Sequence, residues 1–164
     1  MQKIIKLFQM SDSVWEKHAN PWSVWTRYPC LPALIAAYWF SETLGLWSWV
    51  IAVLTVIWIW LNPRVFPRPG TTHHWASKAV LGERVWLNHK QIPIPSHHTR
   101  AIRWLNAIMT LASAMIVIGM LLDQASWLLF GTIAVLLGKS WFLDRMVWLF
   151  EDMKEHQAYQ DWLY

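Results

Sequence analysis

Glu83 is the acidic residue whose surroundings are least expected for a carboxylate. It belongs to the stretch WASKAVLGERVWLN, in which apolar residues recur at helical spacing. On a helical wheel of about 100° per residue, one arc holds Trp75, Ala76, Ala79, Val80, Trp86 and Leu87. Glu83 falls inside this arc, whereas Ser77, Arg84 and Asn88 lie opposite. A carboxylate in apolar surroundings must be protonated, paired or bound to a cation. Glu83 is therefore a candidate ligand or base, with a structural ion pair to an arginine as the alternative.

Asp144 and Glu151 are two further acidic candidates, in the stretch DRMVWLFEDM. On a helix Asp144, Trp148 and Glu151 share one stripe, and Arg145 and Asp152 share a neighbouring one. Two carboxylates two turns apart are separated by roughly 10 Å along the axis, so they cannot hold one ion unless another segment inserts. That segment could be the central loop with Glu83 and a histidine. The alternative is a set of ion pairs with the arginines near the membrane.

Histidines supply the remaining candidate metal ligands. His97 and His98 follow the stiff run IPIP, which fixes them better than the loop pair His73 and His74. Adjacent side chains diverge in most conformations, so we expect only one of His97 and His98 to act. His18 precedes the break at Asn20-Pro21. A divalent metal ion is thus one candidate cofactor, with candidate ligands Glu83, Asp144, Glu151, His18, His97 and His98.

Other polar residues near the expected helix ends are candidates for binding ligands or for pinning the loop to the bundle. They are Arg27, Asn62, Arg64, Arg84 and Arg145. The lone Cys30 excludes a disulfide within the chain and a thiolate metal cluster. We expect it to be a small buried apolar residue.

The composition places these residues in a membrane protein. The chain has 164 residues, of which 55% are apolar, 15% are charged and 15 are Trp. Tryptophan is favoured at the membrane–water boundary, where an apolar ring and a polar N–H are both accommodated. The formal net charge is +4, but the basic residues flank apolar stretches. Anionic lipid headgroups are therefore the expected partners, together with a membrane complex or a second copy of the chain, and nucleic acid is not.

Four apolar stretches predict an all-α, four-span bundle built from two hairpins, with amphipathic helices on the cytoplasmic side. A span needs roughly 20 predominantly apolar residues. The first stretch, Leu31–Phe40, is short unless it begins near Trp25. The others are Leu44–Leu61, Ile102–Leu122 and Trp127–Leu143. Pro63 is expected to end the second span, and the fourth span is expected to continue as a helix through DRMVWLFEDM.

The charge distribution predicts the orientation. Neither the turn at residues 41–43 nor the turn at residues 123–125 contains Lys or Arg, and all 14 basic residues lie elsewhere. The positive-inside rule then puts both termini and the central loop in the cytoplasm. We read residues 1–164 as one membrane domain. Its parts are an interfacial segment (1–24), a hairpin (25–61), a cytoplasmic loop (62–100), a second hairpin (101–150) and a cytoplasmic tail (151–164).

Two local features are predicted before the first span. Ile4, Ile5 and Phe8 fit either a short helix on the membrane surface or a frayed terminus. Ser13 and Glu16 have the spacing of a capping box at the start of a helix, and Asn20-Pro21 should end that helix.

The motifs HANPWSVWTR, WLNPRVFP, WASKAVLGERVWLN and LGKSWFLDRMVWLFEDM resemble a family of small bacterial membrane proteins of unknown function. The resemblance covers His18 to Met153 and implies a bacterial membrane location, without a mechanism. Membrane desaturases share the expected layout, but their HxxxH and HxxHH motifs are absent from this sequence.

The sequence is compatible with three functions. The first is a protein that binds lipids or assembles with partners. The second is a membrane enzyme with a His/carboxylate metal site, acting on a lipid-soluble substrate. The third is an oligomeric transporter, which is disfavoured because no span carries an acidic residue near its middle.

Overall fold

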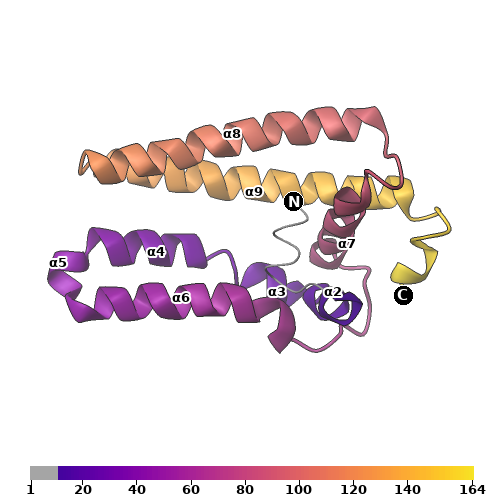
Figure 1. Ribbon diagram of the computed structural model, residues 1–164, viewed down its shortest axis with the longest axis horizontal. Helices are drawn as coiled ribbons and strands as arrows, with labels where there is room; N and C mark the ends of the chain where they lie inside the picture. Colours follow the sequence, from indigo (N-terminus) through magenta and orange to yellow (C-terminus); the bar gives the residue numbers. More distant parts are fainter. Residues whose placement is uncertain (1–10) are drawn as a thin grey trace. The chain divides into compact units, whose positions relative to one another are not determined.

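The computed structural model describes residues 11–164, and this part of the chain is all helical, with no strand. The surface helix predicted around Ile4 lies outside the described residues. Figure 1 shows the helices, whose bounds are α2 Asp12–His18, α3 Pro21–Trp25, α4 Cys30–Trp39, α5 Ser41–Leu44, α6 Leu46–Val65, α7 Trp75–Asn88, α8 Ser96–Leu121 and α9 Ala125–Met153, followed by the 3₁₀ turn η1 Gln160–Trp162. The chain forms two compact units, one ending at Ser77 and one beginning at Lys78.

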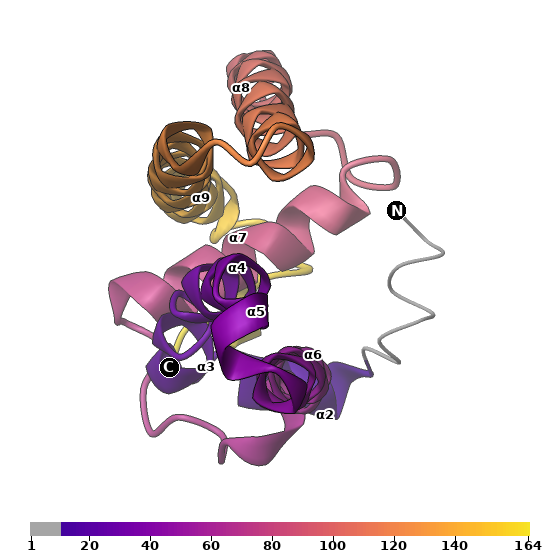
Figure 2. The same ribbon diagram turned by 90° about the vertical axis from the view of Figure 1, so that its left-hand side faces the viewer.

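The first unit is a helical hairpin preceded by two short helices. α4 packs against α6, and the short helix α5 connects them (Figure 2). Gly45 joins α5 to α6 at φ +55°, a conformation that costs little for glycine because it has no Cβ. α2 also packs on α6. The break predicted at Asn20-Pro21 is confirmed, since α2 ends at His18 and α3 begins at Pro21.

The second unit contains the longest helices, α8 and α9, which lie side by side as an antiparallel hairpin (Figures 1 and 2). Small residues allow their close approach. A Cβ added at Gly131 would lie 2.8 Å from Ile116 Cγ1 and 3.0 Å from the Ala112 carbonyl oxygen. Small residues at helix interfaces are the usual means of tight packing in membranes. The predicted continuation of the fourth apolar stretch is confirmed, because α9 runs unbroken to Met153.

A buried core lies where α7 meets the open end of the α8–α9 hairpin. Its fully buried members include Val85 of α7, Ile102 of α8, and Met146 and Phe150 of α9. The crossing is closest at Gly82, where an added Cβ would lie 1.9 Å from the Met146 carbonyl oxygen. α7 therefore packs through its small residues.

Three described helices, α6, α8 and α9, are long and apolar enough to cross a membrane. Within their most apolar windows only 17%, 22% and 28% of residues are buried inside the protein. Such exposed apolar surface is normal when lipid covers it and abnormal in water. The first predicted span, Leu31–Phe40, coincides with α4, whose 10 residues are too short alone. The four-span count therefore stays a prediction.

Three local predictions were wrong. Pro63 lies inside α6, which continues to Val65, because proline in the last turn removes only one of the helix's hydrogen bonds. α2 begins at Asp12 after the N-cap Ser11, without a side-chain cap, so the capping box based on Ser13 and Glu16 does not form. Ser77, expected on the polar face of its helix, is fully buried.

The arc predicted for α7 is confirmed only in part. Its members Ala76, Ala79 and Val80 are buried, but Trp86 and Leu87 are only half-buried. Gly82 and Val85, which lie outside the arc, are buried. A helix that crosses another at short distance uses its small residues for the contact, and a hydrophobicity wheel gives those residues little weight.

Gly82→Ala is expected to destabilise the second unit. The new methyl group would meet backbone atoms of Met146, which cannot move aside as a flexible side chain would. Overpacking of this kind costs about 1–3 kcal/mol. Gly70→Ala is the matched control, because a Cβ at Gly70 meets nothing within 4 Å. Thermal unfolding in mild detergent should show a lower Tm for Gly82→Ala only, and equal Tm values for both variants would contradict the close crossing.

Candidate functional site

Two histidines and one carboxylate meet at the open end of the α8–α9 hairpin. His97 and His98 lie in the first turn of α8, and Asp152 lies in the last turn of α9. The antiparallel arrangement brings these two helix ends together although the residues are far apart in sequence. Among the described residues these three form a group whose ligand atoms lie within 4.8 Å of one another.

Both histidine rings face the same carboxylate oxygen. His98 Nε2 lies 2.8 Å from Asp152 Oδ2, and His97 Nε2 lies 3.6 Å from it. The ring centroids of His97 and His98 are 4.1 Å apart. The expected divergence of adjacent side chains therefore does not occur here. The His98 side chain is fully buried, whereas those of His97 and Asp152 are 60% and 48% exposed.

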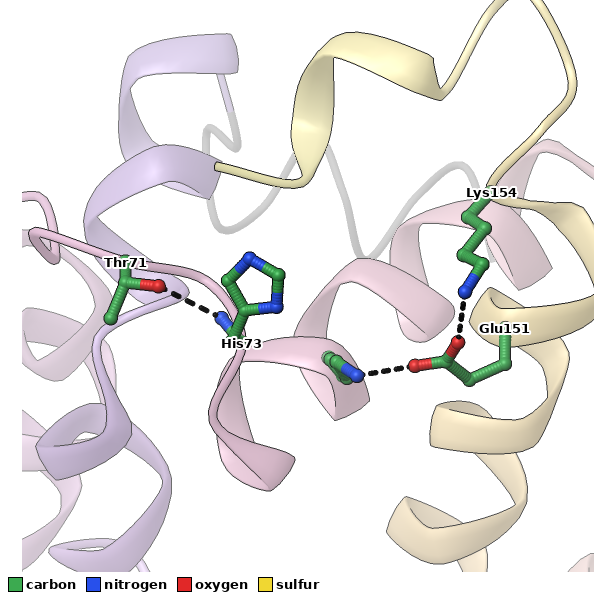
Figure 3. A network of polar contacts seen from close by, with 5 residues as sticks. Thr71, His73, Glu151 and Lys154 are labelled. Atoms are coloured by element: carbon green, nitrogen blue, oxygen red, sulfur yellow. Dashed lines mark hydrogen bonds and ion pairs between the residues drawn. The ribbon is translucent and has the colours of Figure 1, made fainter.

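Glu151, the neighbour of Asp152, is held by two lysines. Its carboxylate contacts Lys78 of α7, and its second oxygen accepts a hydrogen bond of 2.8 Å from Lys154 (Figure 3). That hydrogen bond raises the pKa of the Lys154 ammonium, so Lys154 stays charged near neutral pH. Figure 3 also shows the separate contact between His73 and Thr71, in which the His73 backbone N–H donates to the hydroxyl. Glu151 is therefore an ion-pair partner of two lysines, whereas the structural alternative paired it with arginines.

The other two acidic candidates lie outside the histidine group. Glu83 is half-buried on α7, and Asp144 is exposed on α9. Neither contributes to the group formed by His97, His98 and Asp152. Of the predicted metal ligands, the group found within the described residues contains His97 and His98.

Three of the predicted binding arginines stack on tryptophan rings. The guanidinium carbon lies 4.4 Å from the ring centroid for Arg64 on Trp60, 4.1 Å for Arg84 on Trp162 and 4.6 Å for Arg145 on Trp148. Such cation–π contacts are worth about 0.5–1 kcal/mol at exposed sites. They hold each guanidinium group against an aromatic ring.

The first unit contains a buried polar network around three of the predicted residues. His18 Nδ1 lies 2.6 Å from Ser23 Oγ, and the Ser23 hydroxyl donates to Asn62 Oδ1 at 2.7 Å. Asn62 Nδ2 donates to Thr26 Oγ1 at 2.7 Å. His18, Ser23 and Asn62 are all buried, so this network ties α2 and α3 to the end of α6.

The donors in this network can be assigned from chemistry. A guanidinium only donates, so Arg27, whose Nη1 lies 3.2 Å from His18 Nε2, makes that ring nitrogen an acceptor. His18 Nδ1 then carries the proton and donates to Ser23. His18 is thus a neutral histidine with both nitrogens engaged, and it cannot bind a metal without breaking the network.

Sequence reasoning missed several residues that the structure brings together. Asp152 was recognised only as part of a stripe with Arg145, and its proximity to His98 depends on the hairpin register. Ser23 and Thr26 were missed because single hydroxyl residues near a helix carry little signal. Ser23 and Thr26 are three residues apart in WSVWT, and Asn62 directly precedes a proline in the later helix. These two features together could have indicated the hydroxyl residues.

Comparison with known proteins gives one match. Residues 1–163 match the model of a family of unknown function, DUF6653. No curated protein and no solved structure matches the chain. The match extends along nearly the whole sequence, so it includes both the histidine group and the buried network.

Asn62→Ala is expected to destabilise the first unit. It removes both hydrogen bonds of the amide and leaves the Ser23 hydroxyl without its acceptor in a buried site. A buried polar group without a partner costs about 1–3 kcal/mol. Asn106→Ala, at an exposed position of α8, serves as the control. Circular dichroism during heating in detergent should show a lower Tm for Asn62→Ala, and a Tm equal to that of the control would show that the network contributes nothing.

Proposed function

We propose that this chain, which belongs to the DUF6653 family of unknown function, is a four-span protein of the bacterial inner membrane. We propose further that it binds anionic lipid headgroups on its cytoplasmic face. Three described helices are long and apolar enough to cross a membrane. To these we add a fourth span, an orientation and a ligand. Both termini and the loop between α6 and α8 would lie in the cytoplasm.

The distribution of basic residues supports this orientation. The turn between α4 and α6 and the turn between α8 and α9 contain no Lys or Arg. The positive-inside rule places such turns outside the cytoplasm. Lys17 precedes α3, so the chain must also cross the membrane between residues 17 and 41. α4, extended by the turn at residues 26–29 and by α3, is the segment available for that crossing.

The observation that carries the lipid-binding proposal is a basic, aromatic surface at the start of α8, formed by Arg100, Arg103 and Trp104. All three side chains are exposed, Trp104 by 67%. Spacings of three and four residues put Arg100, Arg103 and Trp104 on one side of the helix. Within residues 11–164 no ion pair holds Arg100 or Arg103. Their guanidinium groups can therefore bind phosphate from the headgroup layer.

The depth of this surface fits the headgroup level. From Arg103 to Leu121 the helix rises roughly 27 Å at 1.5 Å per residue, close to the hydrocarbon thickness of about 30 Å. The other end of α8 is the turn without basic residues. When the turn between α8 and α9 lies at one membrane surface, Arg100 and Arg103 lie at the opposite surface. There anionic lipid attracts basic side chains.

Two alternatives stay open beside lipid binding. Assembly with a membrane partner or a second copy of the chain would use the exposed apolar surfaces of α6, α8 and α9. A membrane enzyme would require a metal site, for which the histidine group at the start of α8 is the available set of ligands. An oligomeric transporter has no supporting observation in the described residues.

Labelling of single cysteines tests the orientation. In a Cys30→Ser background, Gly70→Cys introduces a thiol in the loop after α6 and Gln124→Cys one in the turn before α9; both positions are exposed. A membrane-impermeant maleimide added to intact spheroplasts should label Gln124→Cys only, and permeabilised cells should allow labelling of both. Labelling of Gly70→Cys in intact spheroplasts would contradict the orientation.

Removal of the two arginines tests the lipid site. Each basic side chain near an anionic surface contributes about 1 kcal/mol, so Arg100→Gln/Arg103→Gln should weaken binding of short-chain phosphatidylglycerol roughly thirtyfold. Lys17→Gln/Lys90→Gln removes the same charge from exposed positions outside the spans. Affinities would be measured in detergent by thermophoresis, with phosphatidylcholine as the uncharged lipid. An equal effect of both double variants, or no preference of the wild type for phosphatidylglycerol, would contradict the proposal.

A further inference from the structure

The geometry points to a binding site for one divalent transition-metal ion formed by His97, His98 and Asp152. We infer that these three side chains supply two nitrogen ligands and one oxygen ligand, and that the remaining coordination positions take water or another small ligand. The positions of the three groups, the burial of His98 and the surrounding charges support this site.

The three ligand atoms are close enough to share an ion. Metal–nitrogen bonds of about 2.0–2.1 Å and metal–oxygen bonds of about 2.0–2.2 Å place neighbouring ligand atoms roughly 3–3.5 Å apart. His98 Nε2 and His97 Nε2 lie 2.8 Å and 3.6 Å from Asp152 Oδ2. All three atoms lie within 4.8 Å of one another. Small side-chain rotations therefore suffice to form the site.

The buried ring of His98 gives the site a fixed element. Its side chain is 0% exposed, and Nδ1 has no hydrogen-bond partner among the described residues. The ring therefore acts through Nε2, which is directed at Asp152 and at the open surface where His97 lies. A simple ion pair between His98 and Asp152 would leave unexplained why the exposed His97 ring lies beside the same oxygen.

Rigid elements hold all three ligands. His97 and His98 belong to the first turn of α8 and Asp152 to the last turn of α9, and these helices pack along their length. Ile102, one turn after His98, and Met153, next to Asp152, are both buried in the core of this unit. A site on packed helices keeps its geometry better than one on a loop. This distinguishes His97 and His98 from His73 and His74, which lie in the loop before α7.

The charges around the site favour a moderate affinity. Asp152 supplies one negative charge, whereas the partial negative charge at the end of α9 is opposed by the partial positive charge at the start of α8. Arg145 acts electrostatically on His98 and opposes a cation. Lys78 and Lys154 are bound to Glu151, so they do not compete for Asp152. Two imidazoles and one carboxylate suit Zn²⁺, Fe²⁺ or Co²⁺, whereas Mg²⁺ and Ca²⁺ prefer sites made of oxygen.

Cobalt binding tests the site directly. The protein would be purified in detergent without a histidine tag, stripped with a chelator and titrated with Co²⁺, whose visible absorption reports nitrogen and oxygen coordination. We expect one Co²⁺ per chain, displaced by Zn²⁺, with elemental analysis confirming the stoichiometry. His97→Ala and Asp152→Asn should each weaken binding at least about tenfold. Both substitutions change exposed side chains, so both variants should fold. Circular dichroism would verify this.

The double variant His73→Ala/His74→Ala is the matched control, because it removes an adjacent histidine pair with no role in the proposed site. It should bind Co²⁺ like the wild type. His98→Ala should abolish binding, but its buried position makes it secondary to the other two variants. Absence of Co²⁺ binding by the wild type, unchanged binding by folded His97→Ala and Asp152→Asn, or loss of binding in the control would overturn the inference.

Discussion

Most of the apolar surface of the long helices is not buried inside the protein, and the rest of this structure follows from that. In α6, α8 and α9 fewer than a third of the residues in the most apolar window are buried inside the protein. Water would penalise such a surface, whereas the hydrocarbon core of a membrane accepts it and requires that backbone hydrogen bonds be satisfied within each helix. The chain can therefore use simple hairpins, and it places its polar contacts at the helix ends.

This placement explains where the chemistry of the chain is found. In the first unit His18, Ser23 and Asn62 form a buried network that fastens short helices to the end of α6. In the second unit α7 packs across the open end of the α8–α9 hairpin, and His98 and Asp152 meet there. The hydrogen bonds of the first network join side chains of neighbouring helices, so this network is a structural tie. The second group brings two imidazoles and a carboxylate together, so it is the candidate binding site.

The sequence predicts the helical architecture well because long apolar runs carry a strong signal. The end of α6 and the exact face of α7 were less predictable, since they depend on contacts between helices. Gly82 shows this most clearly, because a glycine has little weight in a hydrophobicity pattern but determines how closely α7 approaches Met146. The histidine group illustrates the same limit. His98 was a candidate from its neighbours in sequence, but its partner Asp152 follows only from the register of the α8–α9 hairpin.

Hydrogen exchange of the protein in lipid nanodiscs, followed by mass spectrometry, tests the central claim that lipid covers these helices. If lipid covers these helices, exchange should be very slow in α6 between Leu46 and Trp60, in the part of α8 beyond Trp104 and in α9 between Trp127 and Leu143. Exchange should be fast in residues 66–74 and 89–95. Exchange in the three helices as fast as in those loops, or a protein that is extracted from membranes without detergent, would contradict it.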